Sequence, residues 1–111
     1  MDLHITARRF HAHETLREHA FHAINKLEDH FDGILSAKLV LSYEKTRNSI
    51  KSAELIVKVQ GTVLKALEKS DDYPKSIDAA VEKVERQLQK LKTRTREKKR
   101  TTTARTVRSK A

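Results

Sequence analysis

The residues best suited to chemistry are basic side chains within "VEKVERQLQKLKTRTREKKR", residues 81–100. Apolar residues recur there at helical spacing as far as Leu91 and then stop, while the basic residues continue. The basic residues on the other side of this predicted helix form what we call the cationic ridge: Lys83, Arg86, Lys90 and Arg94. Ammonium and guanidinium groups in such a row suit the phosphates of a nucleic-acid backbone.

Further basic residues are predicted to extend this binding surface. Lys75 and Lys92 flank the cationic ridge on the same helix, and Arg17 and Lys26 lie outside the apolar stripe of an earlier predicted helix. If both helices cover one side of a sheet, all these residues converge on a single surface. Aromatic residues make up only 5% of the chain, so stacking on unpaired bases is not expected. The predicted partner is therefore a structured RNA or a duplex, contacted through its backbone.

The net charge of +9 is concentrated at one end of the 111-residue chain. Residues 1–82 carry twelve Lys or Arg and thirteen Asp or Glu, a net charge of −1, whereas residues 83–111 carry twelve and two, a net charge of +10. Such asymmetry favours a polyanionic partner and electrostatically steered association. The alternative interpretation is that the basic end only keeps the protein in solution.

Catalysis is poorly supported by the residues present. The chain has no cysteine, no glycine-rich phosphate loop and no serine–histidine–aspartate signature, so neither enzyme activity nor a cofactor is predicted. Asp71 and Asp72 are typical of helix capping rather than of an acid pair. No apolar run approaches the roughly 18 residues of a membrane span, and no signal peptide is recognisable at the start. We expect a cytoplasmic protein with no membrane partner.

The six histidines all lie within residues 4–30 and raise the question of a metal site. Two pairs have spacings that can hold a divalent metal: His11 with His13, and His19 with His22. The preferred interpretation is surface histidine without metal, with His19 and His22 facing solvent. His13 is interpreted as a weak N-cap.

A single α+β domain is predicted from the alternation of sequence patterns. Strands are expected at about residues 3–6, 37–45, 52–60 and 62–68, and helices at about 14–31 and from Tyr73 onward. This β-α-β-β-β-α order predicts a two-layer sandwich in which a four-stranded, mostly antiparallel sheet carries both helices on one face. An alternative with one undocked helix is rejected, because it leaves apolar residues such as Leu27 or Ile77 without cover. A polar connection is expected at residues 45–51.

Three local features sharpen the prediction. Gln60-Gly61 predicts a tight hairpin between the last two strands. Burying Lys65 would be costly, so Leu64 and Ala66 are expected to face the helices. Residues 1–95 are predicted to form the domain, and residues 96–111 a basic extension that begins as helix and ends as an unstructured tail.

Two segments resemble a known family. "DDYPKSIDAAVEKVERQLQKLK", residues 71–92, is similar to the second-helix signature of ribosome hibernation-promoting factors, also called ribosome-associated inhibitors or the sigma-54 modulation protein family. "TLREHAFHAINKLEDHF", residues 15–31, resembles their first helix. The likeness covers about residues 1–95 and is to the short form of the family. Pro74 departs from the motif, but it is tolerated in the first turn of a helix.

The resemblance implies a fold akin to double-stranded-RNA-binding domains and a role without catalysis. It implies binding to the small ribosomal subunit and the 70S ribosome, in the decoding channel over the mRNA path and the A and P tRNA sites. There the protein would inhibit initiation during stress or stationary phase, as a monomer when off the ribosome. Both the pairing of ribosomes and the holding of single inactive ones remain open. The likeness also covers the family's basic positions, which implies contacts to ribosomal-RNA phosphates from Arg17, Lys26, Lys83, Arg86, Lys90 and Lys92. Tyr73 and Asp78 match the family motif as well, and Tyr73 is expected to pack at the helix start.

Overall fold

The computed structural model describes the backbone of residues 1–8, 10–44 and 50–108, and the side chains of residues 1–8, 10–43 and 50–92. Within these residues, the elements follow the predicted order β-α-β-β-β-α. They are β1 (Asp2–Ala7), α1 (Glu14–His30), β2 (Ile34–Glu44), β3 (Ile50–Val59), β4 (Thr62–Ser70) and α2 (Tyr73–Arg108). The last two residues of the predicted polar connection belong to β3, and its first five lie outside the described residues.

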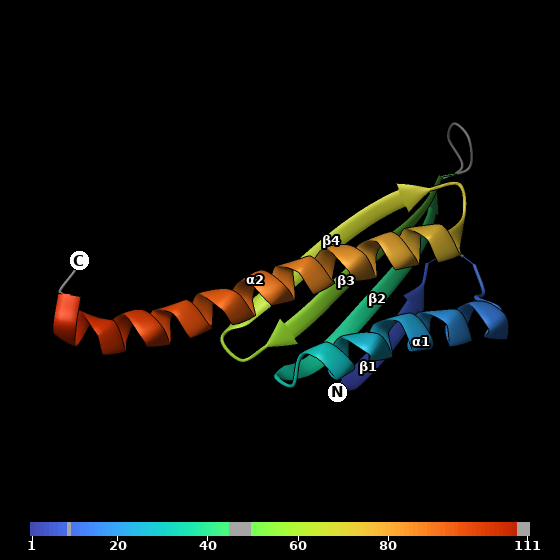
Figure 1. Cartoon of the computed structure of the whole chain (residues 1–111). Coiled ribbons are helices and arrows are strands. Elements are labelled where there is room, and N and C mark those ends of the chain that lie inside the picture. The colour runs from blue at the N-terminus through green and yellow to red at the C-terminus, as the bar shows by residue number, and fades with distance from the viewer. Residues whose placement is uncertain (9, 45–49, 109–111) are drawn as a thin grey trace.

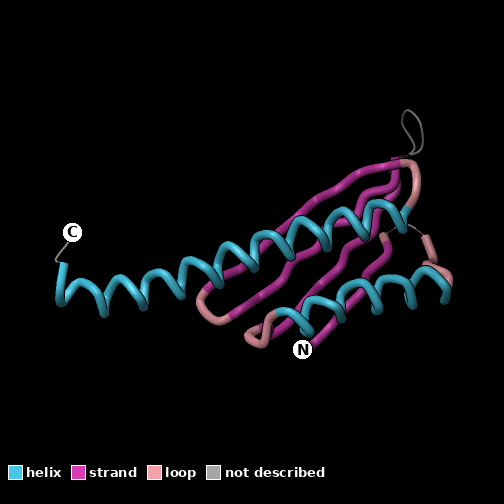
Figure 2. Tube along the Cα trace, in the orientation of Figure 1, coloured by secondary structure: helices cyan, strands magenta, loops and turns pink. Residues whose placement is uncertain are grey.

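The strands form one mixed sheet in the order β1-β2-β3-β4. β1 pairs parallel with β2, and the other two pairs are antiparallel. Because parallel neighbours need a crossover, α1 makes that connection, and both helices lie on one face of the sheet (Figures 1 and 2). α2 packs over β3 and β4 and lies beside α1. The predicted two-layer α+β architecture is confirmed.

The core lies between the helices and the inner face of the sheet. β3 shows the alternation most clearly, because every second residue is at most 3% exposed: Ala53, Leu55, Val57 and Val59. On β4, Ala66 is buried and Leu64 packs against the core, whereas Val63 is 54% exposed. The predicted alternation that keeps Lys65 out of the core is therefore confirmed.

Each helix contributes the apolar stripe that its spacing predicts. On α1 the buried residues are Ala20, Ala23, Ile24 and Leu27, with Leu16 and Phe31 packed at the two ends. On α2 they are Ile77, Ala80, Val81, Val84 and Leu88, with Tyr73 and Leu91 partly buried beside them. His13 is the N-cap of α1 and makes no side-chain capping bond, as expected of a weak cap.

The hairpin between β3 and β4 turns where the sequence predicts. Val59 pairs with Thr62, which leaves Gln60 and Gly61 in the turn. Gly61 has a φ of +79°, a conformation that side chains with a Cβ rarely adopt. A glycine at this position therefore sets the register of the last strand pair.

α2 continues well beyond the core. It has 36 residues, and among its described side chains Leu91 is the last in the apolar cluster. The molecule measures 59 × 28 × 18 Å, and its radius of gyration of 17.3 Å exceeds the value of about 13 Å expected for a compact chain of this length. The helix runs on to Arg108, through most of the predicted basic extension, and residues 109–111 lie outside the described residues. No glycine or proline interrupts residues 75–108, which allows the helix to propagate.

Candidate nucleic-acid interface

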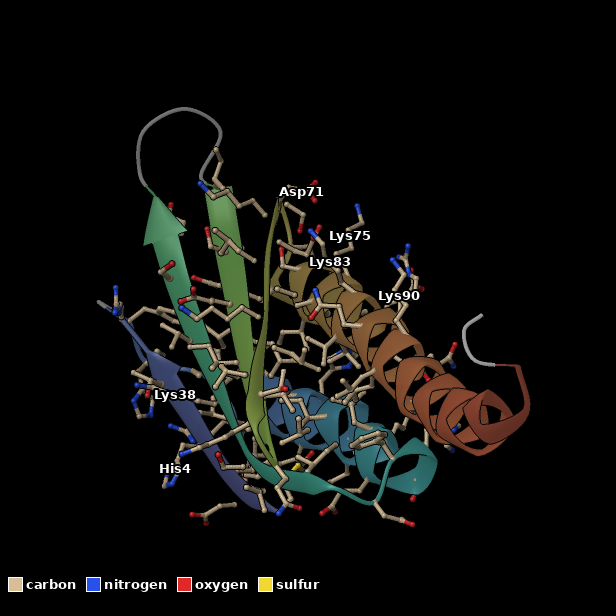
Figure 3. All side chains as sticks on the ribbon, turned by 90° about the vertical axis from the view of Figure 1, so that its left-hand side faces the viewer. His4, Lys38, Asp71, Lys75, Lys83 and Lys90 are labelled. Carbon is tan, nitrogen blue, oxygen red and sulfur yellow. The ribbon has the colours of Figure 1, made fainter. Side chains whose placement is uncertain are left out.

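The described part of the cationic ridge lies on the outer side of α2. Lys83, Arg86 and Lys90 are all exposed, and Lys75 lies further back along the same side. Figure 3 shows Lys75, Lys83 and Lys90 on the opposite side of the molecule from His4 and Lys38. Arg94 belongs to α2, but its side chain lies outside the described residues. The structure thus brings together four of the predicted residues, spaced about one helical turn or two apart.

Carboxylates accompany three of these four cations. Lys83 Nζ lies 3.3 Å from Glu68 Oε2 of β4, and Arg86 donates to Glu82 Oε1 at 3.0 Å. Lys75 Nζ lies 3.4 Å from the Asp71 carboxylate. Among the described residues, none forms an ion pair with Lys90. Exposed pairs of this kind contribute about 0–1 kcal/mol, so a phosphate can compete for the same cations.

Arg17 does not join the ridge. It is nine residues from Lys26, and an α-helix has about 3.6 residues per turn, so the two lie on opposite flanks of α1. Arg17 shares the flank of Glu28, whose carboxylate lies 3.1 Å from the Met1 amino group at the start of β1. The predicted convergence on a single surface is corrected in this respect. The role of Arg17 as a phosphate contact stays a prediction.

Lys26 and Lys92 lie along the groove between the helices rather than on the ridge. Lys26 is two turns from His19 on α1, and Lys92 is two turns from Glu85 on α2. Across this groove, His19 Nε2 lies 2.8 Å from Asp78 Oδ1, and His30 Nε2 lies 3.6 Å from Glu85 Oε2. The basic residues therefore fall into a ridge on the β4 side of α2 and a second group beside the groove.

The histidines take a structural role at this groove. His19 is half-exposed, in keeping with the predicted solvent-facing position, and it is also bonded to Asp78, a partner that the sequence did not predict. His22 is exposed, as predicted. Within the described side chains, no three histidines or carboxylates converge in a way that could hold a metal. The metal hypothesis gains no support from this part of the chain.

Tyr73 anchors the first turn of α2, the packing role expected of it. Its hydroxyl donates to the Ser42 carbonyl at 3.1 Å, and its ring stacks on Phe10 with centroids 4.8 Å apart. Burial, and secondarily the neighbouring Tyr43, raises the pKa of the Tyr73 hydroxyl. One turn further on, the buried Ser76 Oγ donates to the Lys51 carbonyl at 2.8 Å. These bonds fix the ridge-bearing helix to β2 and β3.

Comparison with known proteins decides the family. The model of a family described as "Sigma 54 modulation protein / S30EA ribosomal protein" matches residues 3–96. The chain belongs to this family. It is a family of ribosome-associated hibernation factors and not of enzymes.

Relatives of this family match most of the chain. It is 30% identical to the ribosome hibernation promoting factor of Azotobacter vinelandii over 92 residues, which are 83% of either chain. It is 31% identical to the ribosome hibernation promotion factor of Staphylococcus aureus, over 78% of this chain and 46% of that longer one. A ribosomal subunit interface protein from Coxiella burnetii has a similar structure, with a TM-score of 0.76 and 26% identity over 84% of this chain and 99% of that one. The N-terminal domain of Thermus thermophilus Protein Y gives 0.73 and 26%, over 82% and 99%.

Cations without a predicted role lie on the strands. Lys38, Lys58 and Lys65 are exposed on β2, β3 and β4, on the face away from the helices. The signal for them in the sequence is the alternation with core residues, which predicts their direction but no function.

In the described part of the chain, no helix is both long and apolar enough to cross a membrane.

Proposed function

We propose that this protein is a hibernation factor that binds the small ribosomal subunit in its decoding channel, across the mRNA path and the A and P tRNA sites. In that position it would block initiation and hold cytoplasmic ribosomes inactive during stress or stationary phase. Family membership supports the ribosome as partner. The observation that carries the binding mode is the exposure of Lys83, Arg86 and Lys90 along one side of α2.

Electrostatics favours ribosomal RNA as the surface that the ridge contacts. Ribosomal RNA presents closely spaced phosphates, and neutralising them with Lys or Arg releases counterions. The carboxylates of Glu68 and Glu82 hold two ridge cations only through exposed pairs. Phosphates can therefore displace them at little cost. The absence of Phe, Tyr and Trp from the ridge residues is consistent with backbone contact rather than base stacking.

The projecting end of α2 supports a channel rather than a flat surface as the docking site. α2 extends far past the sheet (Figure 1), and residues 93–111 carry eight Lys or Arg and one Glu. A cationic helix end that projects past the sheet can enter a narrow, negatively charged passage. We propose that this segment follows the path of the mRNA.

Cosedimentation with small subunits tests the proposal. The variant K83E/R86E/K90E should no longer appear in the small-subunit fractions of a sucrose gradient, because it replaces three attractive charges with repulsive ones. The matched control K38E/K58E/K65E changes the net charge equally on the opposite face, and it should still cosediment. Equal loss in both variants, or unchanged binding of the ridge variant, would contradict the assignment.

A general binder of duplex RNA without ribosomal address is the competing function, and the same charge asymmetry favours it. A competition experiment separates the two functions. If the protein is specific for the ribosome, duplex RNA added at the same phosphate concentration as the small subunits should displace little of it from them. Displacement in proportion to added phosphate would favour the general binder.

A further inference from the structure

The face of the sheet away from the helices is uncovered in the described structure. Both helices lie on the other face, and His4 and Lys38 mark the open side in Figure 3. Its side chains come from alternate positions of the strands. On the three long strands the central ones are Ser36, Lys38, Val40, Glu54, Ile56, Lys58, Val63, Lys65 and Leu67, and of these Val40 is buried.

Strand register arranges these residues as an aliphatic centre among lysines. Ile56 of β3 lies between Lys38 of β2 and Lys65 of β4, which forms one row across the sheet. In the rows on either side, Lys58 pairs with Val63, and Glu54 pairs with Leu67. Ile56, Val63 and Leu67 therefore lie on adjacent rows of two neighbouring strands.

The exposure of this centre is unusual for an open sheet face. Antiparallel sheets with one solvated side normally present polar residues there, yet Val63 is 54% and Leu67 50% exposed. Lys38, Lys58 and Lys65 are exposed and form no ion pair with any described residue. Glu54 is half-buried and is the one carboxylate among the central positions. The face thus combines aliphatic residues on adjacent rows with lysines that have no ion-pair partner among the described residues.

We propose that this open face docks an acidic, amphipathic segment of a partner protein. Leu, Ile or Val side chains of that segment would cover Ile56, Val63 and Leu67. Its Asp or Glu residues would pair with Lys38, Lys58 and Lys65. Charge complementarity selects this occupant, because the apolar centre and the cationic surround must be satisfied by one ligand.

Two other occupants fit the same face less well. RNA would place phosphates over aliphatic side chains, which offer neither a hydrogen-bond donor nor a positive charge. The central positions also offer no aromatic ring for bases to stack on. A second copy of this chain would set lysines against lysines, a juxtaposition that costs free energy. The inference does not depend on the ribosomal role, since the open face and the cationic ridge lie on opposite sides of the molecule (Figure 3).

NMR titration of the full ¹⁵N-labelled chain tests the proposal with two synthetic probes. One is an amphipathic peptide of Leu and Glu in which Leu recurs every three or four residues, so that it lies on one face of a helix. The other is poly-L-glutamate of the same charge. The peptide should shift backbone amides of β3 and β4 around Ile56, Val63 and Leu67, and it should bind about tenfold more tightly than poly-L-glutamate. Equal affinity for the two probes, or shifts confined to α2, would overturn the proposal.

Variants separate the apolar contribution from the charge. V63S/L67S should weaken peptide binding about tenfold and leave poly-L-glutamate binding unchanged, whereas K38Q/K58Q/K65Q should weaken both. The ridge variant K83E/R86E/K90E is the matched control and should retain the peptide shifts. All these side chains are exposed, so melting temperatures should stay close to wild type and report any failure to fold.

Competing occupants give distinct outcomes in the same samples. Larger shifts on β3 and β4 with a short duplex RNA than with the peptide would identify RNA as the ligand and overturn the proposal. Concentration-dependent dimerisation that V63S/L67S abolishes would identify a second copy instead. Loss of small-subunit binding in the ridge variant bears only on the ribosomal role and leaves this test intact.

Discussion

The two cationic faces of this molecule differ in what surrounds their positive charges. On the outer side of α2, Lys83 and Arg86 have carboxylate neighbours, and no large hydrophobic residue is exposed on the described part of that helix. On the open sheet face, the lysines surround Val63 and Leu67 and have no ion-pair partner among the described residues. Similar charge therefore suits different ligands: a bare polyanion at the helix, and an acidic segment with apolar residues at the sheet.

Removing a shared core residue should produce the largest effect, because both faces depend on it. Leu55 is fully buried between Leu39 and Ala66 on the neighbouring strands. Leu55→Ala should lower the free energy of unfolding by about 2–5 kcal/mol in urea titrations. Leu67→Ala, on the same sheet but exposed, is the control and should change it by less than about 0.5 kcal/mol. Equal losses would contradict the two-sided arrangement.

The second-largest effect should be on the salt dependence of small-subunit binding, which should differ between variants of the two faces. If about six phosphates are neutralised, the logarithm of small-subunit affinity should fall with the logarithm of salt concentration with a slope near −4 to −5. The variant K83E/R86E/K90E should reduce that slope by about three, roughly one for each lost contact. K38E/K58E/K65E should leave the slope unchanged. Filter binding at several salt concentrations measures both, and equal reductions would show that the ridge is not the contact.

The anchor that joins the helix layer to the sheet can be weakened alone. Tyr73→Phe removes the hydroxyl bond to Ser42, which should cost about 1 kcal/mol of stability at neutral pH. Because burial raises the pKa of Tyr73, the folded state holds this proton more tightly than the unfolded state. Its stabilising effect is therefore complete below about pH 10 and is lost as the pH rises further. Urea titrations at neutral and alkaline pH should show a shallower alkaline decline for Tyr73→Phe, and an identical decline would contradict the assignment.

The smallest effects should come from single carboxylates on each face. Glu82→Gln releases Arg86 from its ion pair, so small-subunit affinity should rise by no more than about fivefold. Glu54→Gln should leave that affinity unchanged and strengthen binding of the acidic peptide to the sheet by a similar factor. Calorimetric titration measures both. If instead Glu54→Gln raised small-subunit affinity and Glu82→Gln strengthened peptide binding, the ligands assigned to the two faces would have to be exchanged.

Much of the fold follows from periodicity alone. Alternation along β3 and β4 and three-to-four spacing along both helices identify the buried residues, since each pattern matches only one backbone geometry. Burial cost decides the direction of Lys65. The extent of α2 is less predictable, because nothing in the core determines where a solvated helix ends.

The arrangement of the binding residues is harder to predict than their identity. Arg17 and Lys26 are both outside the apolar stripe, but that stripe leaves two flanks, and only the position of α2 distinguishes them. The bond between His19 and Asp78 joins residues 59 positions apart, so it depends on how the helices pack side by side. Sequence patterns predict what a residue faces within its own element, and tertiary packing determines which residue it meets.

The parallel pairing of β1 with β2 has a consequence for folding. β2, β3 and β4 are neighbours both along the chain and in the sheet, so they can assemble through short connections, whereas β1 must wait for the whole of α1 to cross over. β1 is also an edge strand, paired on one side only. We therefore expect the amide hydrogens of β1 to exchange with solvent sooner than those of β3. Local opening at this margin would release α1 with Lys26, while a meander still carrying α2 and its ridge stays assembled.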